Sequence, residues 1–173
     1  MRSTLTRDDY AVAYRWFDLA TPLPFDCGTL CGKMCCSEWQ PGVGMYLYPG
    51  EEAMFTQDED WLVWEEHDTA EFEFCPEWSG KVTFIMCQRP CPRHRRPVEC
   101  RTFPLAPHLT AAGALEMVLD PDGLHLCPLI RGGELEVLDP AFVTNAHRAW
   151  EVLLQDPLIR ADVLWRSRLR TGS

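Results

Sequence analysis

The sequence lacks any apolar run of the roughly 18–20 residues that cross a bilayer. Residues 1–20 contain Asp8, Asp9 and Asp18 and no continuous apolar stretch of the kind that a secretory signal needs. These absences predict a cytoplasmic protein without membrane contact. Because a reducing cytosol keeps thiols free, grouped cysteines in such a protein favour metal binding over disulfides.

Positive charge is also scarce, with 16 Lys and Arg against 26 Asp and Glu and a net charge of −10. Such a chain repels a phosphate backbone as a whole, so we expect no nucleic-acid partner, whereas a protein partner stays open. Residues 58–73 are rich in acids, and the basic residues gather in the segment that follows. These basic residues are Arg89, Arg93, Arg95, Arg96 and Arg101.

Nine cysteines carry the chemistry of this chain. At about 5% of the residues they fall short of the roughly 8–10% that marks a short disulfide scaffold, and their odd number argues further against one. Cys75 stands alone and is predicted to be a buried apolar thiol. The other eight form two groups, Cys27, Cys31, Cys35 and Cys36, then Cys87, Cys91, Cys100 and Cys127.

An all-thiolate set selects soft metals, meaning zinc or iron–sulfur rather than calcium or magnesium. Four thiolates satisfy one tetrahedral zinc ion or one cubane cluster. If residues 27–36 are helical, their first three cysteines share a face, and Cys36 lies about 100° further round. Because Gly28 and Gly32 leave the backbone free to bend, an irregular loop is an equal alternative.

Alternating and β-branched patterns predict strands at 43–48, 61–66, 71–75, 81–87 and 115–120, with a short helix beginning near Glu51. Helices are predicted over 7–19, where Thr6 and Asp9 have capping-box spacing, and after Asp139-Pro140 and Asp156-Pro157. The sequence therefore predicts an α+β fold with a short antiparallel sheet and a C-terminal helical pair. Residues 1–138 would form the cysteine-cluster domain, with 139–173 packed on it as a helical extension.

The segments CGTLCGKMCC and CPRHRRPVECRTFPL resemble the YkgJ-type cysteine-cluster family, a zinc- or iron-chelating domain related to a domain of flagellin lysine methylases. The resemblance covers about residues 25–127. The interval from Cys91 to Arg96 is one residue shorter than the usual form, and Cys75 has no counterpart. The matching residues are Cys27, Cys31, Cys35, Cys36, Cys91, Arg96, Pro97, Cys100, Arg101, Phe103 and Pro104.

The resemblance and the two thiol groups together predict that all eight grouped cysteines bind metal. Iron–sulfur binding with a redox or accessory role is the first hypothesis, and a structural zinc module for protein interaction is the alternative. A part in protein-lysine methylation is a second alternative, although no glycine-rich S-adenosylmethionine site is visible. Arg96 and Arg101 would offset the negative charge of the thiolates. His94 would pack against the ligating residues without binding the metal itself. No catalytic residue is assigned, because a lone histidine is more often a surface or satisfied core residue.

Overall fold

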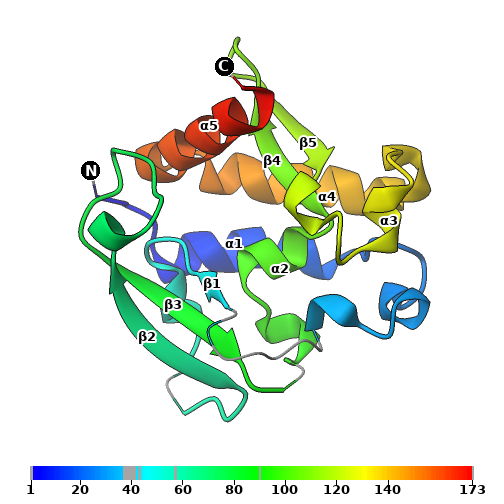
Figure 1. Cartoon of the computed structure of the whole chain (residues 1–173), viewed down its shortest axis with the longest axis horizontal. Helices are drawn as coiled ribbons and strands as arrows, with labels where there is room; N and C mark the ends of the chain where they lie inside the picture. The colour runs from blue at the N-terminus through cyan, green and yellow to red at the C-terminus, as the bar shows by residue number, and fades with distance from the viewer. Residues whose placement is uncertain (1, 37–41, 43, 57, 90, 173) are drawn as a thin grey trace.

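The computed structural model describes residues 2–36, 42, 44–56, 58–89 and 91–172. Within these residues, five α-helices accompany five strands in two antiparallel sheets, so the predicted α+β class is confirmed. Helix α1 runs through the middle of the molecule, with a three-stranded sheet on one side and the two C-terminal helices with a hairpin on the other (Figure 1).

The three-stranded sheet has the order β1-β3-β2, with β1 at Met45–Tyr46, β2 at Leu62–Asp68 and β3 at Lys81–Cys87. The predicted strand at 43–48 is thus confirmed over two residues, and Val43 lies outside the described part of the chain. A Cβ at Gly44 would stand 2.2 Å from the carbonyl oxygen of Ile85, so only glycine permits this close approach to β3. The sheet carries Cys87 at the end of its central strand.

The predicted strand at 71–75 is wrong. These residues lie in the connection between β2 and β3, which begins with a 3-10 turn at Thr69–Glu71. Thr69 and Gly80 close the base of this connection, because the Thr69 amide donates to the Gly80 carbonyl at 2.9 Å and the Gly80 amide donates to Thr69 Oγ1 at 3.0 Å. Phe72 and Phe74 pack their rings on Tyr46, so ring packing replaces strand pairing in this aromatic stretch.

A separate hairpin joins β4 at Leu105–Leu109 to β5 at Leu115–Leu119. Strand β5 was predicted and is confirmed, whereas β4 was missed because Pro107 interrupts its pattern. Proline is tolerated on edge strands, and both strands of a two-stranded sheet are edges. Pro107 pairs with Met117 in the register of the hairpin.

The three long helices begin at the N-cap residues from which they are predicted. Helix α1 spans Arg7–Asp18 with the Thr6–Asp9 capping box in place, α4 spans Pro140–Leu153 behind Asp139, and α5 spans Pro157–Thr171 behind Asp156. Two short helices were not predicted: α2 at Val98–Thr102 and α3 at Pro128–Arg131.

The main core lies between α1, α4, α5 and the hairpin, where Tyr10, Phe142 and Trp150 are fully buried. A smaller core under the three-stranded sheet contains Trp61 and Ile85. Cys75 is 1% exposed and belongs to the main core, so the prediction of a buried apolar thiol is confirmed. Among the described helices, none has the length and apolar character needed to span a membrane.

Candidate metal-thiolate site

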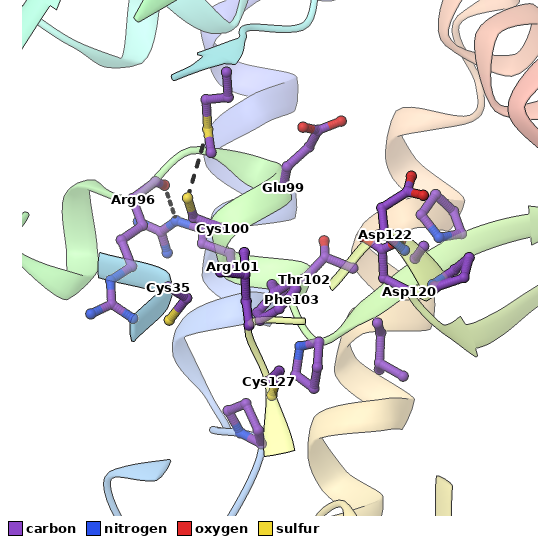
Figure 2. Close-up of a pocket in the computed structure, with 18 of the residues that line it drawn as sticks. Cys35, Arg96, Glu99, Cys100, Arg101, Thr102, Phe103, Asp120, Asp122 and Cys127 are labelled. Atoms are coloured by element: carbon purple, nitrogen blue, oxygen red, sulfur yellow. Dashed lines mark hydrogen bonds between the residues drawn. The ribbon is translucent and has the colours of Figure 1, made fainter. Parts of the chain in front are cut away.

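A cavity of about 770 Å³ lies beside α2 and α5 and extends to the cysteine segments. Figure 2 shows Cys35, Arg96 and Cys100 on one side of it, Cys127 at another edge, and Asp120 and Asp122 across from them. Six of the eight grouped cysteines line this cavity: Cys27, Cys31, Cys35, Cys36, Cys100 and Cys127. Both cysteine groups therefore reach the same region of the molecule.

The first cysteine group is an irregular segment and not a continuous helix. It consists of two 3-10 turns, Cys27–Leu30 and Met34–Cys36, separated by Gly32 and Lys33 in the left-handed region with φ of 64° and 63°. Asp26 caps the first turn by accepting a hydrogen bond from the Gly28 amide at 3.0 Å. The left-handed step between the turns means that Cys35 and Cys36 do not continue the path of Cys27.

Cys35, Cys36 and Cys91 form a line of interacting thiols. The Sγ atoms of Cys35 and Cys36 lie 3.8 Å apart, and Cys36 also shares a hydrogen bond with Cys91. The hydrogen bond from Cys36 lowers the pKa of Cys35, and the same bond raises the pKa of Cys36. The bond to Cys36, followed by burial, holds the pKa of Cys91 far above its ordinary value.

Cys87 and Cys100 complete this set. Burial is the main cause that raises the pKa of Cys87 to about 11, and the neighbouring thiols Cys91 and Cys36 raise it further. Burial also raises the pKa of Cys100 well above its usual range, with contributions from Cys91, Cys87 and Cys36. The Cys100 thiol donates to Met45 Sδ at 3.6 Å. We call Cys36, Cys87, Cys91 and Cys100 the thiol tetrad.

Cys27, Cys31 and Cys127 also line the cavity. Burial raises the pKa of Cys27, and Cys127 and Cys31 are among the groups that raise it further. Cys127 is 8% exposed. All nine cysteines are free thiols, and the exposed Cys35 interacts with Cys36 and Cys100 of the tetrad and also with Cys31.

Arg96 is the cation of the tetrad. It shares a hydrogen bond with Cys91, and the charges of Cys36, Cys91 and Cys100 raise its pKa against the opposing effect of burial. Its Nε is buried and has no hydrogen-bond partner among the described residues. A guanidinium in this position stabilises thiolates, and its Nε keeps a donor free for a further acceptor.

The contacts of Arg101 hold the backbone around the site in place. Its guanidinium donates to Asp18 at 2.5 Å and to the carbonyl oxygens of Arg96, at 2.6 Å, and His94. It also lies 4.0 Å from the centre of the Tyr14 ring. These contacts fix α2 against α1. The His94 side chain is exposed, and its part in this arrangement is the carbonyl that Arg101 binds.

Two further arginines pair with the acidic stretch that precedes them. Arg89 lies 3.2 Å from Asp60, and Arg95 donates to Glu59. Arg93 donates to the carbonyl of Ala20 at 3.0 Å and lines the cavity. The arginines of this segment are therefore divided between ion pairs with the acidic stretch, a backbone contact and the tetrad.

Glu51 is a residue that the sequence did not single out for the site. It is 1% exposed and accepts hydrogen bonds from Tyr14 Oη at 2.8 Å and from the amides of Tyr48 at 3.1 Å and Val98 at 2.6 Å. Burial raises the pKa of this carboxyl to about 7. Because Val98 is the first residue of α2, Glu51 anchors the helix that carries Cys100.

Arg166 is a further residue that the sequence did not single out for the site. Its Nη1 lies 2.8 Å from Glu99 Oε1, and its Nε lies 2.9 Å from Asp162 Oδ2, an ion pair without hydrogen-bond geometry. The guanidinium also lies 5.9 Å from the centre of the Tyr48 ring. Sequence spacing gives no signal for this pairing, because Glu99 and Arg166 are far apart along the chain.

The thiols converge without forming a closed ligand shell. No group of three or more His, Cys, Asp or Glu side chains in the described part of the chain has an arrangement that could hold a metal ion. No family model, curated protein or solved structure matches this chain. The resemblance carried by the cysteine and Arg96-Pro97 motifs therefore stays a prediction.

Proposed function

We propose that this protein binds an iron–sulfur cluster through the thiolates of Cys36, Cys87, Cys91 and Cys100 and has a redox or accessory role in a reducing cytoplasm. The observation that carries the proposal is the convergence of these four thiols. They come from separate parts of the chain, yet Cys36 and Cys100 line the same cavity, and Cys91, Cys87 and Cys36 all add to the effect of burial in raising the pKa of Cys100. Soft, grouped thiolates select zinc or iron–sulfur.

The surroundings of the tetrad suit a group that carries negative charge. Arg96 supplies a guanidinium that interacts with all four thiols, and its buried Nε has no hydrogen-bond partner among the residues that the structure describes. Hydrogen bonds to the sulfurs of a cluster stabilise it and adjust its reduction potential. When bound, such a cluster supplies one-electron redox chemistry.

Binding requires the tetrad to contract, because its thiols are not arranged to hold a metal in this structure. Cys87 ends a paired strand and Cys100 lies in an anchored helix, whereas Cys36 ends the irregular segment. We therefore expect residues 27–36 to adjust on binding. Ordering of this segment would then be coupled to the metal, as in other sites where ligation and local folding are linked.

The test is purification without oxygen, followed by iron, sulfide and zinc analysis and a visible spectrum. The expected result is a coloured protein with iron and sulfide in equal amounts. Cys100→Ser should remove most of the iron and colour, whereas Cys75→Ala should retain both, because Cys75 lies in the main core. A colourless protein with about one zinc ion per four thiolates would overturn the proposal in favour of the structural zinc module.

A further inference from the structure

Cys35, Cys36 and Cys91 lead from the surface toward the interior of the tetrad. Cys35 is exposed, whereas Cys36 and Cys91 are partly buried. The first two sulfur atoms are 3.8 Å apart, and Cys36 is in hydrogen-bonding contact with Cys91. A disulfide reagent in solution therefore meets Cys35 first, and each following thiol touches the one before it.

We propose that the metal-free protein performs thiol–disulfide exchange with small disulfides such as oxidised glutathione, and that the oxidation passes from Cys35 to Cys36 and finally to Cys91. Arg93 and Arg96 line the same cavity and offer cationic partners for the carboxylates of glutathione. This activity uses two tetrad cysteines but does not depend on the iron–sulfur proposal.

The reaction has three balanced steps. Cys35 loses its proton to solvent, and its sulfur attacks one sulfur of oxidised glutathione. The glutathione disulfide breaks, a mixed disulfide forms on Cys35, and one glutathione leaves and takes up a proton. The Cys36 sulfur then loses its proton and attacks Cys35 Sγ, which expels the second glutathione and links the two neighbouring cysteines.

In the third step, Cys91 loses its proton and attacks Cys36 Sγ, and Cys35 is released and protonated. The bond between neighbouring cysteines is a suitable intermediate because their Cα atoms are about 3.8 Å apart, below the roughly 4.4–6.8 Å of ordinary disulfides. Strained disulfides of this kind are readily attacked. Overall, Cys36 and Cys91 are oxidised by two electrons, and one oxidised glutathione becomes two reduced molecules.

The final Cys36–Cys91 disulfide would occupy two of the four tetrad thiols. Oxidation and metal binding at the tetrad would therefore exclude each other. The protein could bind metal only after a thiol reductant had reopened this disulfide.

The experiment treats the full-length, reduced and chelator-stripped protein with oxidised glutathione, then counts free thiols and maps linked peptides by mass spectrometry without reduction. We expect a loss of about two thiols per chain and a Cys36–Cys91 peptide pair. Cys91→Ser should stop the reaction with Cys35 joined to glutathione or to Cys36. Cys35→Ser should slow formation of the Cys36–Cys91 pair by about tenfold or more, because the exposed entry thiol is gone.

Cys75→Ala is the matched control and should react like the parent protein, since this thiol is buried away from the site. The proposal is overturned if the Cys36–Cys91 pair forms at the same rate in Cys35→Ser. It is equally overturned if glutathione spreads over several cysteines and no linked pair appears. Reconstitution of the reduced protein with iron and sulfide is measured separately, so failure of one proposal leaves the result for the other intact.

Discussion

The buried carboxyl of Glu51 makes the stability of the metal-free protein depend on pH in a definite direction. Burial raises its pKa from 4.5 to about 7 in the folded protein, whereas the unfolded chain keeps the ordinary value. Between these two values the folded state binds more protons than the unfolded state. The stabilisation from this group is therefore complete below pH 4.5 and is lost as the pH rises toward 7.

A shift of this size corresponds to about 3 kcal/mol, at about 1.4 kcal/mol for each pKa unit. Glu51→Gln removes the titration while it keeps the length of the side chain and one acceptor oxygen. We therefore expect the fall in unfolding free energy between about pH 5 and pH 8 to be smaller in Glu51→Gln than in the parent protein, by about 2–3 kcal/mol. The comparison cancels the effects of the other titrating groups.

Urea unfolding at the two pH values, in reductant and chelator, measures this difference. Glu52→Gln is the control, because Glu52 is the exposed neighbour in the same 3-10 turn and should keep the pH dependence of the parent. An unchanged pH dependence in Glu51→Gln would refute the reasoning, since it would mean that the buried carboxyl does not titrate in this range.

Three further substitutions test the frame. Gly44→Ala places a Cβ 2.2 Å from a carbonyl oxygen of β3, and should lower the unfolding free energy measured in urea by about 2 kcal/mol or more. Gly132→Ala is the control, because its Cβ would meet the nearest atom at 3.8 Å and should leave the unfolding free energy almost unchanged. Asp156→Ala removes the N-cap of α5 and the hydrogen bond from the Thr4 amide, and should lower the unfolding free energy by about 3 kcal/mol in thermal unfolding. Asp139→Ala removes only an exposed N-cap, that of α4, and should lower it by about 1 kcal/mol. Arg101→Lys removes the guanidinium group whose hydrogen bonds to Asp18 and to the Arg96 carbonyl hold α2 in place. This variant should have a lower melting temperature, and its Cys100 should react faster with a thiol reagent.

Local signals predicted the three long helices well, whereas the short helices α2 and α3 were not predicted. Thr6 with Asp9, Asp139 with Pro140 and Asp156 with Pro157 each begin a helix, because capping depends on residues within one turn. The segment 71–75 has the composition of a strand, but a strand also needs a partner edge. The chain closes this connection through Thr69 and Gly80 instead.

The candidate site was predictable in its residue types and not in its grouping. Sequence proximity placed Cys27 and Cys36 in one set, yet the left-handed step at Gly32 and Lys33 separates them, so that Cys36 meets Cys91 and Cys27 meets Cys127. Such partners depend on tertiary contacts that spacing does not encode. The same limit applies to Glu51, whose three donors come from α1, from Tyr48 in the segment after β1, and from the start of α2.

If the tetrad binds a metal as proposed, the anchoring of α2 would set the order in which its thiols close around that metal. Glu51 holds the start of this helix and Arg101 ties it to α1, while Cys87 is fixed by its pairing with Leu62. Cys36, in contrast, ends a segment built from short turns. An incoming metal would therefore be received by the stationary thiols of Cys87 and Cys100 and enclosed last by Cys36. The rate of metal binding would then be set by closure of the segment that ends at Cys36. Release of a bound metal would require the same segment to open again.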